Sequence, residues 1–270
     1  MQLLVSVRDA REAATAFAGG ADVIDAKDPT RGALGPVTPA ALDAIQAVLA
    51  ARRPLSAALG DATTAHRVRA SVPARTDLAF VKLGFAGKGG ASMRSLEHLA
   101  HAARDAATTP VILVAYADWE QAVSPEPSTI LDVARAIHAA GVLLDTAMKR
   151  RRLLEILTAE DLAAWIAAVY GAGLISAIAG GLDEADIAIV RRAGAAIAGV
   201  RGAACAVGEG RLGPISELRV ARLSALAHET PFSRRPALVE GGAQPAEFVR
   251  GEYHRFHSFR ERASEITVDQ

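Results

Sequence analysis

Short, nearly continuous apolar runs recur along the chain, and longer alanine-rich segments with mixed polar positions separate them. A run that is apolar at almost every position is typical of a strand buried on both faces of a parallel sheet. The eight predicted strands are Leu3–Val7, Val23–Ala26, Leu55–Leu59, Leu78–Leu83, Val111–Ala115, Val142–Asp145, Leu174–Ala179 and Ile197–Val200. The pattern therefore predicts strands that alternate with helices.

Polar residues and glycines mark where the predicted helices begin and end. Asp9 is placed to cap the first helix, and Glu12, three residues later, would complete a capping box. Gly19 and Gly20 would end that helix. Thr38, which precedes a proline, is a second predicted helix start. Further helix starts are predicted at Ser92, Ser128, Thr158 and Asp183.

This order of elements predicts an α/β fold. Eight parallel strands joined by right-handed helical crossovers, in a chain of this length, favour a single closed (β/α)8 barrel over residues 1–229. An open doubly wound sheet is the alternative. Residues 230–270 hold prolines, a Gly-Gly pair and five of the twelve aromatic residues. Because a disordered tail is usually poor in aromatic residues, we expect this C-terminal extension to dock on the barrel or on a neighbouring subunit.

Composition narrows the function classes. Thirty basic and thirty acidic residues cancel, which argues against a partner that is a nucleic acid or an anionic membrane. A single cysteine, Cys205, excludes a disulfide framework and a multi-thiolate zinc site. No apolar run approaches the roughly 18 residues of a membrane span, and the N-terminus reads as a strand instead of a signal peptide. We therefore predict a cytoplasmic protein with no metal and no cofactor.

The scarcity of lysine is the most informative count. The chain has 26 arginines and four lysines, namely Lys27, Lys82, Lys88 and Lys149. Lysine can become a neutral amine that attacks a carbonyl group, whereas arginine stays charged. The lysines that remain are therefore candidates for nucleophilic or acid–base chemistry. A drift in base composition is the alternative explanation for their scarcity.

Three of these lysines lie at or after the carboxyl ends of even-numbered predicted strands. The carboxyl ends of the strands form the face on which barrel enzymes carry their active sites. Lys27 ends the second strand, Lys82 lies near the end of the fourth, and Lys149 follows the sixth. Asp25 shares a strand face with Lys27, and Asp145 pairs with Lys149. Neighbouring ammonium groups would lower the pKa of one lysine. An isolated lysine is more often a surface cation, and we expect Lys88 to be one.

Small residues after the last two predicted strands indicate a phosphate site. Gly180 and Gly181 follow the seventh strand, and Gly202 and Ala203 follow the eighth. Barrels commonly bind phosphate there through backbone N–H groups, and Arg201 could add a bidentate contact. The alternative is that these glycines only turn the chain. The glycine motif of residues 208–213 follows the last strand, so it does not indicate a dinucleotide site.

Six ordered segments resemble the (5-formylfuran-3-yl)methyl phosphate synthase family, whose members make the furan precursor of methanofuran. The resemblance runs from Leu3 to about Ala227. It rests on Gly20–Pro29, Val81–Gly84, Ala115–Asp118, Leu144–Lys149, Ala179-Gly180 and Val200–Cys205. The archaeal members end near the last barrel helix, so the resemblance does not reach residues 230–270.

The resemblance implies a lyase that joins two molecules of glyceraldehyde 3-phosphate and releases phosphate and water. Lys27 matches the family's Schiff-base lysine and Lys82 its proton-accepting lysine. Asp25, Asp145 and Lys149 match other active-site residues. A cytoplasmic enzyme of one-carbon metabolism is then expected, with a small phosphorylated substrate, no nucleic-acid or membrane partner, and a homo-oligomeric state.

Two other functions remain open. A Schiff-base aldolase of class I, acting on another sugar phosphate, would use nearly the same chemistry as far as the second carbonyl. A non-catalytic barrel could instead bind a partner enzyme through its aromatic extension. Lysines and aspartates at the strand ends argue against that second alternative, because a scaffold does not need them.

Overall fold

The computed structural model describes residues 1–74 and 77–229, which contain a closed parallel barrel. Strands pair in sequence order, and β1 pairs with β8 to close the sheet. The predicted (β/α)8 barrel is thus confirmed, and the open sheet is excluded. The strands are β1 Gln2–Val7, β2 Val23–Ala26, β3 Leu55–Asp61, β4 Phe80–Gly84, β5 Val111–Tyr116, β6 Gly141–Asp145, β7 Ile175–Ile178 and β8 Ile197–Val200.

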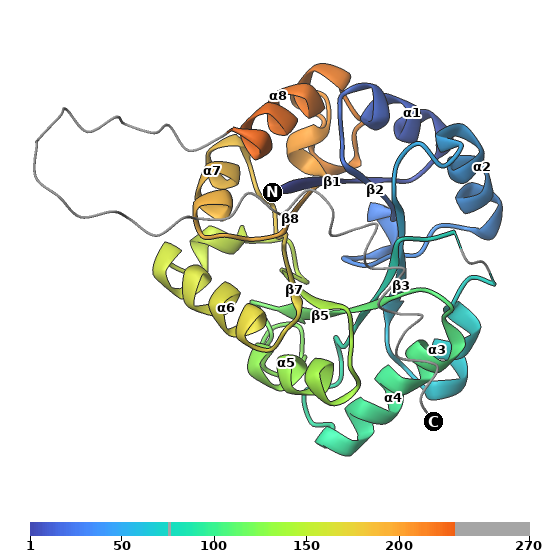
Figure 1. Cartoon of the computed structure of the whole chain (residues 1–270), viewed down its shortest axis with the longest axis vertical. Coiled ribbons are helices and arrows are strands. Elements are labelled where there is room, and N and C mark those ends of the chain that lie inside the picture. The colour runs from blue at the N-terminus through green and yellow to red at the C-terminus, as the bar shows by residue number, and fades with distance from the viewer. Residues whose placement is uncertain (75–76, 230–270) are drawn as a thin grey trace, which may run out of the picture. The chain divides into compact units, whose positions relative to one another are not determined.

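Helices surround the barrel and cover the outer face of its strands (Figure 1). The α-helices are α1 Ala10–Ala18, α2 Pro39–Leu49, α3 Ala65–Ser71, α4 Met93–Ala106, α5 Pro127–Ala136, α6 Ala159–Gly171, α7 Glu184–Arg192 and α8 Glu217–His228. Short 3-10 helices lie in the loops at η1 Pro29–Arg31, η2 Leu153–Glu155, η3 Gly202–Ala204 and η4 Gly210–Leu212. No helix within the described ranges is long and apolar enough to cross a membrane.

Most predicted helix starts are confirmed, and two details are wrong. The side chains of Asp9, Thr38, Ser92, Thr158 and Asp183 all cap helices by accepting backbone N–H groups. Helix α5, however, begins at Pro127, before the predicted cap Ser128, because proline is well suited to the first helical position. Glu12 accepts the N–H of Arg8 and not that of Asp9.

Residues alternate between the two faces of each strand. On β1, Leu3, Val5 and Val7 belong to the hydrophobic core beneath the helices, whereas Leu4 and Ser6 line the barrel interior. This period of two places polar side chains inside the barrel without breaking the apolar layer outside it. The predicted C-terminal extension, 230–270, lies outside the described residues.

Candidate active site

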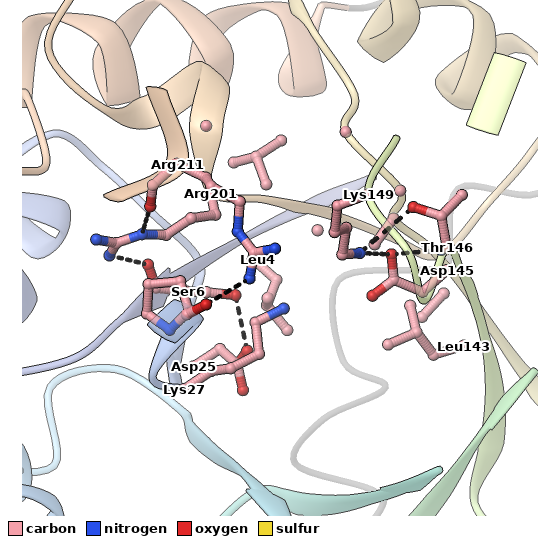
Figure 2. Close-up of a pocket in the computed structure, with 18 of the residues that line it drawn as sticks. Leu4, Ser6, Asp25, Lys27, Leu143, Asp145, Thr146, Lys149, Arg201 and Arg211 are labelled. Atoms are coloured by element: carbon pink, nitrogen blue, oxygen red, sulfur yellow. Dashed lines mark hydrogen bonds and ion pairs between the residues drawn. The ribbon is translucent and has the colours of Figure 1, made fainter. Parts of the chain in front are cut away.

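The five predicted catalytic residues line one cavity of about 220 Å³ at the carboxyl end of the barrel. They are Asp25, Lys27, Lys82, Asp145 and Lys149. Figure 2 labels all of them except Lys82. Asp25 and Lys27 come from the end of β2, Lys82 from β4, and the other two from the end of β6 and its loop. The even-numbered strands therefore bring all five side chains together.

Asp25 is a fully satisfied carboxylate at the floor of this cavity. Its side chain has no solvent exposure, and its Oδ2 lies 2.6 Å from the Lys82 ammonium nitrogen. The Ser6 hydroxyl donates to Oδ2 at 2.8 Å, and the Ser56 hydroxyl donates to Oδ1 at 2.9 Å. Serines on β1 and β3 thus hold Asp25 of β2, which in turn holds Lys82 of β4.

Burial and charge oppose each other in this pair. Burial alone would raise the pKa of Asp25, but the charges of Lys82 and Lys27, together with the hydrogen bonds that Asp25 accepts from Lys82 and Ser6, hold that pKa below its usual value. Burial is the largest influence on the pKa of Lys82 and lowers it, the charge of Lys27 lowers it further, and the Asp25 carboxylate opposes the shift only in part. Lys82 therefore releases a proton more readily than an ordinary lysine.

The second pair, Asp145 and Lys149, belongs to a loop. Lys149 Nζ lies 2.5 Å from Asp145 Oδ1, which also accepts the N–H of Thr146 at 2.7 Å. Asp118 supports the loop by accepting the N–H groups of Ala147 at 2.7 Å and of Met148 at 2.8 Å. The Lys149 backbone has a φ of 56°, an uncommon value for a residue with a side chain.

This pair is less completely satisfied than the first. Asp145 Oδ2 is buried and has no hydrogen-bond partner in the described part of the chain. Burial raises the pKa of Asp145, but the charges of Lys149 and Lys27 outweigh it and lower the pKa overall. The pKa of Lys149 is also lowered, first by burial, although the Asp145 carboxylate opposes the shift.

Lys27 lies between these pairs. Its side chain is nearly buried, and its ammonium nitrogen makes no hydrogen bond or ion pair with any described residue. Its charge nevertheless contributes to the pKa shifts of all four other residues. An amine without a protein partner, surrounded by two carboxylates and two amines, is well placed to attack a carbonyl group.

The predicted phosphate site is brought together only in part. Gly180, Gly181 and Gly202 line the cavity, whereas Ala203 does not, and its carbonyl accepts a hydrogen bond from Arg219. The φ angles of Gly180 and Gly181 are +107° and +73°. A Cβ on Gly180 would lie 2.9 Å from Leu153, so this turn requires glycine.

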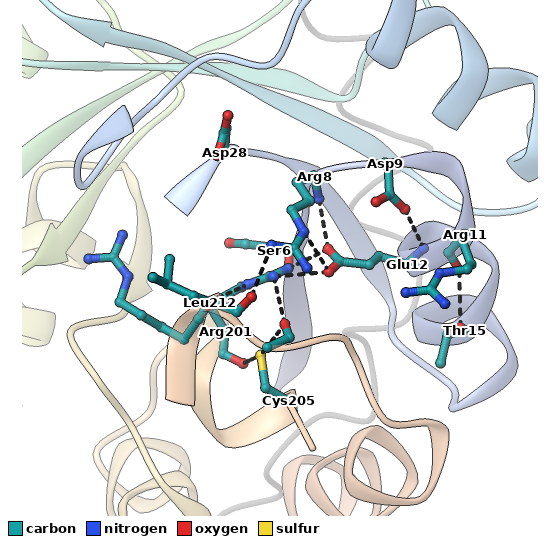
Figure 3. A network of polar contacts seen from close by, with 12 residues as sticks. Ser6, Arg8, Asp9, Arg11, Glu12, Thr15, Asp28, Arg201, Cys205 and Leu212 are labelled. Carbon is teal, nitrogen blue, oxygen red and sulfur yellow. Dashed lines mark hydrogen bonds and ion pairs between the residues drawn. The ribbon is translucent and has the colours of Figure 1, made fainter. Parts of the chain in front are cut away.

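Arg201 has no guanidinium N–H free for a substrate. Its Nη1 and Nη2 pair with the Glu12 carboxylate at 2.5 and 3.0 Å, and Nη1 also donates to the Ser6 carbonyl at 3.0 Å (Figure 3). Nε donates to the Arg211 carbonyl and Nη2 to that of Gly213, both at 3.0 Å. Since these contacts use all five donors, the expected bidentate phosphate contact through this side chain is not supported.

Several lining residues were missed by the sequence analysis. Arg150, Arg151 and Arg152 line the cavity beside Lys149, and a run of four basic residues after the sixth strand was the available signal. Eight lining residues are basic and three acidic, in a chain with no net charge. The basic members are Lys27, Lys82, Lys149, Arg150, Arg151, Arg152, Arg201 and Arg211. Such a cavity favours anionic ligands.

The ends of β3, β4 and β5 do not line the cavity. There, Tyr116 is fully buried and its hydroxyl donates to Asp61 Oδ1 at 2.7 Å. Burial, and then the Asp61 charge, raise the pKa of Tyr116 well above its usual value. A Cβ on Gly84 would come within 2.5 Å of both side chains. This close packing fills the barrel at the ends of these three strands, so that β4 and β5 reach the cavity only through residues before their ends, such as Lys82.

Within the described ranges, no group of three or more His, Cys, Asp or Glu side chains is arranged to hold a metal ion. The cavity combines the amine of Lys27, which has no partner among the described residues, with the buried amine of Lys82, whose pKa is lowered. Two carboxylates lie beside these amines, and arginines line the same cavity. These groups suit carbanion chemistry on a small carbonyl compound that carries negative charge.

Comparison with known proteins identifies a family that matches most of the chain. A family model described as 4-HFC-P synthase matches residues 3–224. A (5-formylfuran-3-yl)methyl phosphate synthase from Methanopyrus kandleri is 33% identical over 230 residues, which cover 83% of this chain and 97% of that protein. One of the same name from Methanocaldococcus jannaschii is 32% identical and covers 84% of this chain and 99% of that protein.

Solved structures share the fold. Orotidine 5'-phosphate decarboxylase from Pyrococcus horikoshii has a TM-score of 0.55 at 14% identity, covering 85% of this chain and 100% of that one. A 3-hexulose-6-phosphate synthase has a TM-score of 0.50 at 21% identity, covering 82% of this chain and 99% of that one. At these identities the likeness concerns the barrel alone.

Proposed function

The chain belongs to the 4-HFC-P synthase family, and from that membership we propose that it joins two molecules of glyceraldehyde 3-phosphate through a Schiff base on Lys27. The product would be (5-formylfuran-3-yl)methyl phosphate, a precursor of methanofuran. One phosphate and water leave as the ring forms. The observation that carries the proposal is the amine of Lys27, which has no partner in residues 1–74 and 77–229 and lies between two aspartate–lysine pairs.

The reaction begins when the neutral amine of Lys27 adds to the aldehyde of one triose phosphate. Loss of water gives an iminium, which withdraws electrons from the neighbouring carbon. Lys82 then accepts the proton from that carbon, and its pKa, lowered by burial, suits this step. The resulting enamine attacks the aldehyde of the second triose, and a carbon–carbon bond forms.

The later steps need groups that move protons between oxygen atoms. Asp145 has a buried carboxylate oxygen with no hydrogen-bond partner among the described residues, and the side chain of Lys149 beside it is partly exposed. We assign to this pair the protonation of the leaving hydroxyl groups during the eliminations that make the ring aromatic. Asp25, which is fully paired, keeps Lys82 oriented.

The direct test is to trap the Schiff base. The protein is incubated with glyceraldehyde 3-phosphate, reduced with borohydride and mapped by mass spectrometry. We expect a triose-derived mass on Lys27, and neither adduct nor turnover in Lys27→Arg, which keeps the charge but loses the nucleophile. Lys88→Arg is the matched control, because Lys88 lies outside the cavity and donates to the Thr63 carbonyl.

Two results would contradict the proposal. An adduct on Lys82 or Lys149 instead of Lys27 would reassign the nucleophile, and turnover by Lys27→Arg would exclude a Schiff base at that position. Product analysis separates the furan synthase from an aldolase that acts on another sugar phosphate, because only the synthase yields an aromatic aldehyde.

A further inference from the structure

The glycine-rich loop of residues 208–213 places one arginine in the active-site cavity. This loop includes η4 and follows β8, and its one lining residue is Arg211. The side chain reaches toward the cavity in which Lys27 and Lys149 lie (Figure 2). The loop therefore serves the same cavity as the catalytic lysines, although its glycine pattern did not indicate this.

The Arg211 guanidinium is fixed on one side and open on the other. Its Nη2 donates to the carbonyls of Pro29 at 2.9 Å and Gly32 at 3.1 Å, both of which follow Lys27 in the chain. Its Nε and Nη1 have no acceptor among the described residues. A guanidinium held by backbone carbonyls, with N–H groups left over, is preorganised to bind a planar or tetrahedral oxyanion.

The backbone of Arg211 is fixed as well. Arg201 donates through Nε to the Arg211 carbonyl and through Nη2 to the Gly213 carbonyl. The same guanidinium is anchored by the buried Glu12 carboxylate. A Cβ on Gly202 would lie 3.8 Å from the Arg211 Cβ, so the loop also lies against the predicted phosphate-binding turn.

Other cations of the cavity are less suited to bind an anion. Arg201 has no free donor, as described above. Arg152 is paired with Glu155, Asp183 and Asp186. Arg151 donates to the Glu155 carbonyl. Arg150 is exposed, and no contact with the described part of the chain fixes its guanidinium.

We propose that Arg211 is the side-chain ligand for a substrate phosphate, a phosphomonoester dianion, and that Arg201 is a positioning residue that holds it. This inference rests on the proposed function, since it concerns the phosphate of the same substrate. It reassigns the predicted arginine contact from the end of β8 to the loop that follows. Arg211 would bind the triose close to Lys27, where the carbonyl reacts.

The first experiment measures phosphate binding without catalysis. Inorganic phosphate is titrated calorimetrically into the wild type, Arg211→Gln and Arg31→Gln. Arg31 is the matched control, because it lies on η1 near the mouth but outside the cavity and donates to the Pro36 carbonyl. We expect a loss of about 10-fold or more for Arg211→Gln, typical of a charged hydrogen bond, and a change below about twofold for Arg31→Gln. Unchanged binding by Arg211→Gln would overturn the proposal.

The second experiment compares glyceraldehyde 3-phosphate with glyceraldehyde, which lacks the phosphate. The readout is the rate of borohydride trapping on Lys27 at substrate concentrations below saturation. In Arg211→Gln we expect the advantage of the phosphorylated substrate to fall about 10- to 100-fold while glyceraldehyde reacts as in the wild type. Arg211→Lys should recover part of the advantage, since it restores the positive charge but not the paired N–H groups of the guanidinium.

The two experiments separate this inference from the proposed function. Equal slowing of both substrates by Arg211→Gln would mean that Arg211 acts on the chemistry or the fold, and would overturn the inference. If the wild type forms no adduct with either substrate, the Schiff-base proposal fails, and the phosphate titration alone then decides the role of Arg211.

Discussion

The two aspartate–lysine pairs of the cavity have the same chemistry in different settings. Asp25 and Lys82 lie on strands, and the Lys82 side chain is 2% exposed. Asp145 ends a strand, but Lys149 lies on a loop and its side chain is 19% exposed. Asp25 accepts from two serine hydroxyls and a lysine, whereas Asp145 Oδ2 accepts from no described residue.

This difference indicates a division of labour. A pair with every acceptor satisfied and little room to move keeps its geometry, which suits the removal of a proton from a fixed carbon atom. A pair that has a carboxylate oxygen without a partner among the described residues, and a partly exposed lysine, suits proton exchange with a ligand. In the proposed mechanism, the same residue types would serve as a fixed base in one case and as a proton relay in the other.

Removing the lysine from each pair should give the largest difference between the two pairs in the free energy of unfolding that is lost. Lys82→Met leaves the buried Asp25 carboxylate without its counter-ion, and we expect the free energy of unfolding to fall by about 3–5 kcal/mol. Lys149→Met should cost no more than about 2 kcal/mol, because Lys149 is partly exposed and its removal opens the buried Asp145 carboxylate to water. Urea unfolding of both variants measures the difference. Equal losses would mean that the two pairs are equally enclosed.

Removing one hydroxyl group beside each pair should give a smaller difference in the free energy of unfolding that is lost. Ser56→Ala leaves Asp25 Oδ1 without its donor, and we expect a loss of about 1.5–3 kcal/mol. Thr146→Val removes a hydroxyl that lies 3.5 Å from the Lys149 nitrogen, at the limit of a hydrogen bond, and should cost less than about 1 kcal/mol. Equilibrium unfolding at neutral pH compares the two, and a larger loss for Thr146→Val would reverse the assignment.

The dependence of stability on pH gives the smallest contrast. The folded pKa of Asp25 is lowered, so its contribution to stability is present above about 3.9, the unfolded value, and is lost as the pH falls through the folded value. Ser6→Ala removes one cause of that lowering and should flatten the loss below pH 3.9. Thr146→Val should leave the pH dependence unchanged, because the backbone N–H of Thr146, and not its hydroxyl, binds Asp145. Unfolding measured between about pH 2 and 6 tests this, and a flattened curve for Thr146→Val would contradict it.

The barrel could be predicted because each strand carries its own signal. The apolar runs that predicted strands ending at Ala26 and Val200 end there in the structure. Elsewhere the predicted strand ends agree or are shifted by one or two residues, as with Leu78, which precedes the first residue of β4 by two. Apolarity shows that a residue is buried, but pairing with a neighbouring strand decides where the ladder begins.

The position of the candidate site residues could be predicted for a related reason. The period of two along a strand places Asp25 and Lys27 on one face, and both line the cavity as expected. The partners of Arg201 could not be predicted, because Glu12 lies 189 residues away in the sequence and meets it only through closure of the barrel. Arg211 was missed because the glycine motif around it was considered only as a dinucleotide site, which its position after the last strand argues against.

Arg201 also has a consequence for the entropy of binding. Its guanidinium joins α1, β1 and the loop after β8 through contacts that are buried, including the Glu12 pair. A phosphate bound at Arg211, as proposed, would therefore meet a surface that is already ordered in the folded protein. Its binding should carry a small entropic cost of ordering, and differences in affinity among related ligands should appear mainly in their dissociation rates.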